Sequence, residues 1–315
     1  MGLLERPMRY DELGLAVVDG NMMRMGGTIL GTTNRGNPFA FPTGKTVKDR
    51  SAEVIAGVRE LGLDAVIGIG GDGSFAILRR LAQQGRIRLV GVPKTIDNDI
   101  GLTETSIGFD TAVSIATEAL DRLQPTAASH ARVMLLEVMG RDAGHIALHA
   151  GIAGGADVIL IPEIAYDLGK VAEKINALKA QGRNFALVVV SEAVRTIEGK
   201  MVKVQYQGGA RRFGGIGHYL GELIARATGA ETRVTVLGHV QRGAPPSAQD
   251  RLIGTAFGVH AVDLIAAGKF DRMVAWQNRK VVDVPLADAI ARYQAVDTGS
   301  DLVKTARALG ICLGD

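Results

Sequence analysis

The sequence predicts an α/β protein made of two doubly wound domains, and three observations lead to this prediction. Short runs of consecutive apolar residues end in glycine and alternate with helical patterns, as expected of parallel strands covered on both faces. Glycine is abundant at 41 residues and aromatic residues are scarce at 4%, which suits many tight strand-to-helix turns. A chain of 315 residues is long for one compact core, so two packed domains are favoured.

The strands and helices follow one another along the whole chain. Buried strands are expected at 64–70, 86–92, 132–138, 157–161, 185–190 and 233–237. Helices are expected at 74–84, 111–123, 145–153, 168–181, 217–227 and 248–267, with a last helix near 287–295. In doubly wound sheets ligands bind beyond the carboxyl ends of the strands, so motifs at those ends are the candidates for function.

Composition excludes several classes of protein. The formal charge of +3 is small, and the basic residues are scattered without interleaved aromatics, which argues against nucleic-acid binding. Cys312 is the lone cysteine, so an internal disulfide and a cysteine-based zinc site are both excluded. The apolar runs are too short to span a bilayer, and residues 1–9 are mixed and charged. We therefore expect a protein of the reducing cytoplasm.

The first candidate motif is GGDGS at 70–74, directly between a strand and a helix. Its glycines let the backbone approach a phosphate, and the start of a helix offers unpaired N–H groups and a positive dipole end. Asp72 would oppose a phosphate unless a cation lay between them, which suggests a magnesium-site residue. The alternative is a plain glycine turn with Asp72 or Ser74 as the helix N-cap.

The second motif is PKTIDND at 93–99, again after a strand. It combines two carboxylates, a hydroxyl and a lysine, which can serve as base, metal ligand and phosphate clamp. In-line phosphoryl transfer needs a group that takes the proton of the nucleophile and positive charge near the migrating phosphoryl group. The alternative is an Asx-rich turn stabilised by its own side chains.

The third motif is MGRDAGH at 139–145, at the end of the strand at 132–138. Arg141 supplies a forked donor for anions beside the small, partly apolar pair Met139 and Gly140. The alternative is a capped turn into a helix in which Arg141 pairs with Asp142.

The fourth motif is LGHVQRG at 237–243, with Arg233 four residues before Leu237. We expect one strand end to present Arg233, His239 and Arg242 together as a cradle for a dianionic phosphate. The alternative is a surface cluster of salt bridges.

In this order and spacing, GGDGS, PKTIDND, MGRDAGH and GHVQRG resemble the phosphofructokinase family over essentially the whole chain. The resemblance implies a kinase that transfers a phosphoryl group to the C1 hydroxyl of fructose 6-phosphate with Mg²⁺. It also implies two similar domains that exchange segments, with the active cleft between them. The donor domain would hold 1–107 and 241–290, and the sugar-phosphate domain would hold 108–240 and 291–315. A homotetramer is expected, or else a dimer.

The resemblance also implies a role for each motif residue. Asp97 would be the catalytic base, assisted at the reacting phosphoryl group by Thr95, Asp99 and Arg141. The sugar phosphate would be bound by Met139, Gly140, Glu192, Arg233, His239 and Arg242, with Arg132 reaching the site of the adjacent subunit. The donor would be bound by Gly71, Asp72, Gly73, Ser74, Lys94, Asn34 and Arg35, with Asp72 also holding the metal.

Two positions bear on the identity of the phosphoryl donor. Family members that use pyrophosphate usually carry aspartate at the position of Gly73, where it blocks the space for the α-phosphate of a nucleotide. Gly73 leaves that space open and favours ATP. Lys94 points the other way, since pyrophosphate users carry lysine there, although some ATP users combine the same glycine and lysine. ATP is therefore the expected donor, with pyrophosphate as the alternative.

The sequence departs from the family pattern in two respects. Family members begin with a strand and a further glycine loop, and the resemblance implies that this chain starts after them, which should expose apolar neighbours in the sheet. An inactive or regulatory ligand-binding form is therefore a second alternative. Gln124 stands where allosteric bacterial members carry an effector-binding arginine, so control by nucleotide or phosphoenolpyruvate is not expected.

Overall fold

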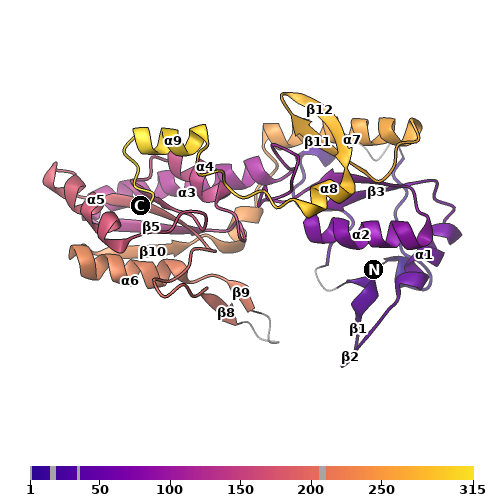
Figure 1. Ribbon diagram of the computed structural model, residues 1–315, viewed down its shortest axis with the longest axis horizontal. Helices are drawn as coiled ribbons and strands as arrows, with labels where there is room; N and C mark the ends of the chain where they lie inside the picture. Colours follow the sequence, from indigo (N-terminus) through magenta and orange to yellow (C-terminus); the bar gives the residue numbers. More distant parts are fainter. Residues whose placement is uncertain (1, 15–18, 34–35, 206–210) are drawn as a thin grey trace. The chain divides into compact units, whose positions relative to one another are not determined.

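The chain divides into two compact units, and the computed structural model describes residues 2–14, 19–33, 36–205 and 211–315 (Figure 1). Unit 1 comprises Met1–Thr95, Ile100–Gly108 and Pro245–Tyr293. Unit 2 comprises Ile96–Asp99, Phe109–Ala244 and Gln294–Asp315. Residues 96–99, which we expected in the first domain, group with unit 2.

Unit 2 is built on a four-stranded parallel sheet. Its strands are β5 (Val133–Val138), β6 (Val158–Leu160), β7 (Ala186–Ser191) and β10 (Thr232–Val236), in the order β10-β5-β7-β6. All residues of β5, β6 and β7 are buried. Their continuous apolar runs therefore identify a sheet that is covered on both faces, as expected.

Helices cover both faces of this sheet (Figure 1). On one face lie α3 (Phe109–His130), α4 (His145–Ala153) and α9 (Asp301–Ala308), which pack on residues such as Leu136 and Val189. On the other face lie α5 (Leu168–Ala180) and α6 (Ile216–Thr228), which pack on residues such as Leu135 and Val188. Successive strand residues thus point to opposite layers, which is the doubly wound arrangement that the sequence predicts.

Unit 1 has a mixed sheet in the order β12-β11-β4-β3. Its strands are β3 (Val66–Gly70), β4 (Leu89–Pro93), β11 (Arg272–Gln277) and β12 (Lys280–Pro285), of which only β12 is antiparallel to its neighbour. One face packs against α2 (Asp72–Gly85) and α8 (Leu286–Ala291), and the other packs against α7 (Ala248–Ala266). Helix α1 (Ser51–Glu60) lies beside α2. The α/β class is therefore confirmed in this unit as well.

Several elements differ from the sequence prediction. The hairpin β11–β12 was not predicted, because its two-residue turn is Asn278-Arg279, both with positive φ, rather than a glycine-containing turn. The helix expected near 287–295 ends at Ala291 and lies within unit 1. The last helix is α9, whose N-cap Ser300 accepts a hydrogen bond from the Val303 N–H. Shorter elements are η1 (Gly2–Leu4), η2 (Met22–Arg24), η3 (Pro38–Ala40), β1 (Phe41–Thr43), β2 (Thr46–Lys48), β8 (Lys203–Gln205), β9 (Arg211–Phe213) and η4 (Gly238–Arg242).

Strand β3 lies at the edge of its sheet and leaves apolar side chains in solvent. Ile67 is 36% exposed and Ile69 is 62% exposed, although both belong to an apolar run typical of a buried strand. Both alternate with the buried Gly68 and Gly70, so they share one face of the sheet, and that face is open at β3.

Candidate active site

The PKTIDND segment leaves the carboxyl end of β4 and buries both of its carboxylates. Asp97 and Asp99 are 3% and 5% exposed, and Asn98 between them has a left-handed φ of 54°. The Asp99 carbonyl accepts a hydrogen bond from the Gln294 N–H at 2.9 Å. The Thr95 carbonyl accepts one from the Ser106 hydroxyl at 2.8 Å. Burial of two carboxylates is costly unless they are compensated, so an ordinary surface turn does not account for this segment.

The loop after β5 carries Arg141 in an uncommon backbone conformation. Gly140 has a φ of 149°, and a Cβ there would lie 2.7 Å from the Ala143 carbonyl oxygen, so glycine is required. Arg141 itself has a φ of 50°, a region that non-glycine residues enter only when their surroundings hold them there. This local strain is the kind found at functional sites.

Arg141 pairs with Asp97 within unit 2. The Arg141 Nε lies 3.4 Å from the Asp97 Oδ2, and the arginine side chain is 58% exposed while that of Asp97 is 4% exposed. A buried carboxylate thus faces the guanidinium of a side chain that solvent can reach. Such a pair places a proton acceptor beside positive charge, as phosphoryl transfer requires.

Glu192 follows β7, and its carboxylate is hydrogen-bonded to the backbone of the loop that carries Arg141. Its Oε1 accepts hydrogen bonds from the Gly140 N–H at 3.2 Å and the Arg141 N–H at 3.0 Å. Burial raises the pKa of Glu192, these two N–H groups lower it, and the negative charges of Asp97 and Glu137 raise it again, for a net upward shift. Glu137 in turn accepts hydrogen bonds from the N–H groups of Gly215 and Gly217 at the start of α6.

We expect Glu192→Gln to keep an acceptor for the Gly140 and Arg141 N–H groups, since an amide oxygen also accepts, while it removes the negative charge. The variant and the wild type should differ in how their free energy of unfolding depends on pH. Because the folded protein binds this proton more tightly than the unfolded chain, the free energy of unfolding falls as pH rises from the ordinary pKa of 4.5 through the raised value. Glutamine removes this loss, so urea unfolding from pH 4 to 8 should show the variant gaining stability relative to the wild type as pH rises. A constant difference would contradict the raised pKa.

The turn η4 follows β10 and presents two of the three residues expected of the phosphate cradle. His239 and Arg242 are exposed on η4, whereas Gln241 between them is 1% exposed. Arg233 is not with them, because it is the second residue of β10 and lies near the opposite end of that strand. Three further strand residues separate it from the turn by about 10 Å of strand length.

Arg233 lies instead with Arg132, which precedes β5. Both guanidinium groups pair with Glu231, the Arg132 Nη2 at 3.0 Å from the Glu231 Oε1. The hydrogen bond from Arg132 and the charges of both arginines lower the pKa of Glu231. Within one chain Arg233 thus lies with Arg132 and not at the turn that carries His239 and Arg242, because the parallel pairing of β10 with β5 brings the two arginines together at the amino end of the strands.

The GGDGS segment joins β3 to α2 in unit 1. The helix begins at Asp72 rather than at 74, so Gly73 and Ser74 lie in its first turn, where backbone N–H groups lack helical partners. Gly70 pairs with Pro93 in the sheet, and its carbonyl accepts a hydrogen bond from the Lys94 N–H at 2.9 Å. The donor-loop candidate and Lys94 therefore lie side by side. Asn34 and Arg35, also expected to bind the donor, lie outside the described residues.

Comparisons with known proteins agree with this arrangement. Residues 1–265 match the family model described as phosphofructokinase. The ATP-dependent 6-phosphofructokinase 1 of Synechocystis sp. is 65% identical over 315 residues, an alignment that covers 100% of this chain and 87% of the relative. The chain belongs to the phosphofructokinase family. A second relative, the ATP-dependent 6-phosphofructokinase 1 of Nostoc sp., is 62% identical over 316 residues, covering 100% of this chain and 88% of the relative.

Solved structures of phosphofructokinases share the fold. The T-state crystal structure of Pichia pastoris phosphofructokinase matches with a TM-score of 0.73 at 26% identity, covering 93% of this chain and 32% of that chain. The chain thus spans about a third of the Pichia protein. The pyrophosphate-dependent phosphofructokinase of Marinobacter aquaeolei matches with a TM-score of 0.67 at 26% identity, covering 84% of this chain and 72% of that chain.

Three residues of this phosphofructokinase support the motifs although sequence reasoning gave them no role. Gln241 accepts a hydrogen bond from the Met139 N–H at 2.9 Å. The His145 Nε2 lies 2.9 Å from the Gln294 carbonyl oxygen, and Gln294 in turn bonds to Asp99. An uncharged polar residue set between His239 and Arg242 was the signal that the sequence offered for Gln241, and its burial is visible only in the structure. No local pattern could have linked Gln294 to Asp99, which are distant in sequence.

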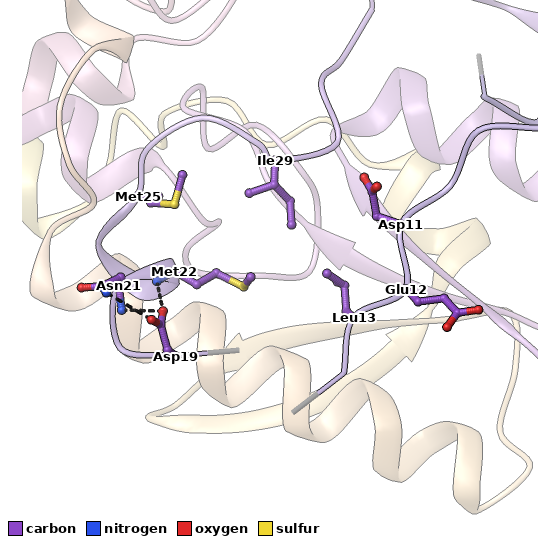
Figure 2. Close-up of a pocket in the computed structure, with 8 residues that line it drawn as sticks. All are labelled: Asp11, Glu12, Leu13, Asp19, Asn21, Met22, Met25 and Ile29. Atoms are coloured by element: carbon purple, nitrogen blue, oxygen red, sulfur yellow. Dashed lines mark hydrogen bonds between the residues drawn. The ribbon is translucent and has the colours of Figure 1, made fainter. Parts of the chain in front are cut away.

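A hollow of about 450 Å³ in unit 1 is lined by residues outside the four motifs (Figure 2). It is lined by residues of 11–13 and 19–29, where Asp19 accepts hydrogen bonds from the backbone N–H groups of Asn21 and Met22. None of the motif residues lines it, so we do not place the catalytic site of this family member there. Each helix in the described ranges is too short or too polar to span a lipid bilayer.

Proposed function

We propose that this chain is an ATP-dependent 6-phosphofructokinase with Asp97 as its catalytic base. The observation that carries the proposal is the buried Asp97 carboxylate, paired at 3.4 Å with Arg141 inside the motifs that match the family. Asp97 takes the proton of the C1 hydroxyl of fructose 6-phosphate, and that oxygen attacks the γ-phosphorus of ATP. The bond from phosphorus to the bridging oxygen breaks, ADP leaves, and Arg141 neutralises charge on the phosphoryl group in transit.

The sugar phosphate would be held by the loop and turn that follow β5 and β10. Met139 and Gly140 line the sugar, Glu192 bonds its hydroxyls, and His239 with Arg242 binds its phosphate. Arg132 would reach the sugar phosphate of an adjacent subunit. Because Glu231 holds Arg233 beside Arg132, we assign Arg233 to the same oligomer-dependent role, in a homotetramer or a dimer.

The donor would lie on the first turn of α2. Gly73 has open space around its Cα, since nothing lies within 4 Å of a Cβ added there, and its small size leaves room for a nucleotide phosphate. Relatives that are 65% and 62% identical carry the name ATP-dependent, which supports ATP over pyrophosphate. Thr95 and Asp99 assist at the reacting phosphoryl group, and Lys94 can contact the phosphates of the donor.

The residues present suit a magnesium ion bound together with the donor. Asp72 begins α2 and is partly exposed, while no cluster of three carboxylate, histidine or cysteine ligands occurs in the part of the chain that the structure describes. Mg²⁺ is commonly held by one or two carboxylates together with substrate phosphates and water, so Asp72 alone is an appropriate protein ligand. When bound, Mg²⁺ supplies charge neutralisation on the donor phosphates. The lone Cys312 supports a cytoplasmic location.

The first test is the initial rate of fructose 1,6-bisphosphate formation with Mg²⁺ and either ATP or pyrophosphate. Turnover with ATP and none with pyrophosphate supports the proposal. A preference for pyrophosphate, which Lys94 would favour, would mean that the chain is a pyrophosphate-dependent phosphofructokinase that uses the same chemistry. No turnover with either donor, while fructose 6-phosphate still binds in calorimetry, would indicate a regulatory ligand-binding form.

Substitution of Gly73 tests the donor site directly. We expect Gly73→Asp to fold normally, because an added Cβ meets nothing within 4 Å. The new carboxylate should occupy the nucleotide space and repel its phosphates, raising the KM for ATP by roughly 10-fold or more, about the cost of one unfavourable charged contact. Gly73→Ala is the matched control and should change the KM for ATP much less. Equal effects of both substitutions would assign the change to backbone conformation instead.

A further inference from the structure

Gln241 is a fully buried amide in a turn whose charged residues are exposed. It is 1% exposed, whereas its neighbours His239 and Arg242 on η4 lie in solvent. Its Oε1 accepts the Met139 N–H at 2.9 Å across 102 residues of sequence. A buried side chain with a long-range hydrogen bond to a functional loop fixes the position of that loop relative to its own turn.

Gln241 and Glu192 together accept hydrogen bonds from three consecutive backbone N–H groups. The N–H groups of Met139, Gly140 and Arg141 are consecutive, and each is accepted by a buried side chain. Gln241 accepts the first, and the Oε1 of Glu192 accepts the other two. We call this arrangement the amide clasp: Gln241 and Glu192 together with the three N–H groups that they accept.

The amide clasp accounts for the unusual backbone of the loop. Gly140 and Arg141 have φ values of 149° and 50°, conformations that a free loop would leave. Because side-chain direction follows the backbone, the approach of the Arg141 guanidinium to Asp97 depends on this geometry. Release of the Met139 amide would let the first residue of the loop relax.

We propose that Gln241 is a positioning residue for phosphoryl transfer: it ties the phosphate-binding turn η4 to the loop that aims Arg141 at the reacting group. The proposal rests on the role assigned to Arg141 above. Gln241 does not touch the reacting atoms, so its effect passes through the loop. A displacement of about 1 Å at a reacting group can cost about 100-fold in rate, which sets the scale of the expected effect.

The test compares Gln241→Met, which keeps size but removes the acceptor, with Gln241→Glu, which keeps an acceptor for the Met139 amide. We expect Gln241→Met to lower kcat by roughly 10- to 100-fold while the KM for ATP changes by less than about 2-fold. Gln241→Glu should recover a large part of kcat, because a carboxyl group this deeply buried is kept neutral and its carbonyl oxygen still accepts the Met139 N–H. The control is Ile175→Val, a buried apolar change on α5 that lowers stability without touching the clasp, and its kcat per folded enzyme should not change.

A double-mutant cycle separates this inference from the proposed function. If Gln241 acts through Arg141, then Gln241→Met should have little further effect on kcat in an Arg141→Leu background. Additive losses, or a kcat of Gln241→Met equal to wild type, would overturn the positioning role while leaving the assignment of Arg141 intact. If Arg141→Leu alone leaves kcat unchanged, the proposed role of Arg141 fails first.

Discussion

Asp97→Asn should lower kcat for fructose 1,6-bisphosphate formation by about 10²- to 10⁴-fold, the contribution typical of a positioned general base. Asparagine keeps the shape of the side chain but cannot take the proton of the C1 hydroxyl. The KM values for fructose 6-phosphate and ATP should change little, because proton transfer occurs only in the transition state. Steady-state rates with saturating substrates measure the effect.

The fold should survive this change. Asp97 is buried, but its partner Arg141 is 58% exposed and stays solvated when the carboxylate is neutralised. No buried charge is therefore left without compensation, in contrast to the breaking of an enclosed ion pair. Circular dichroism and thermal unfolding provide the control. A kcat within a few-fold of wild type would remove Asp97 from the role of base.

Arg141→Leu should lower kcat by roughly 10²- to 10³-fold, the scale seen when one stabiliser of transition-state charge is removed. Leucine keeps an apolar stem but withdraws the guanidinium that faces Asp97 at 3.4 Å and, in the proposed mechanism, the migrating phosphoryl group. Arg141→Lys should recover only part of the rate, since an ammonium group cannot reproduce the planar fork.

The pH profile distinguishes this role from a purely structural one. With Arg141 gone, the negative charge of Asp97 loses its nearby cation, so the acidic limb of the kcat/KM profile should move to higher pH. Loss of rate without such a movement would mean that Arg141 acts only on the phosphoryl group. An unchanged kcat would contradict both roles.

Most of the secondary structure could be predicted because its signals are local. Continuous apolar runs such as those of β5 and β7 indicate strands buried on both faces, and the glycines after them indicate turns. The hairpin β11–β12 was missed because its Asn278-Arg279 turn lacks the glycine that usually marks such hairpins. Helix boundaries were also predicted imprecisely. Helix α2 begins at Asp72, inside the glycine motif, and not at 74, because residue types mark a helix end less sharply than a helix interior.

Strand direction decided which predicted residues meet. PKTIDND and MGRDAGH follow the carboxyl ends of their strands, and the structure places Asp97 beside Arg141 as their chemistry suggests. Arg233 belongs to the amino end of β10 and therefore joins Arg132 instead of His239. The strand predicted at 233–237 already separates Arg233 from the turn, but only the pairing of β10 with β5 shows that its neighbour is Arg132.

The sequence by itself determined the α/β class, the doubly wound pattern and the motifs that identify a phosphofructokinase, since these depend on residue types and short spacings. Only the tertiary structure decided the contacts on which the function of those motifs depends. Gln241 reaches Met139 across 102 residues, and Glu192 reaches Arg141 across 51. Such bonds form only when the parallel pairing of β10 with β5 and of β5 with β7 brings distant strand ends together, and no local pattern encodes that pairing.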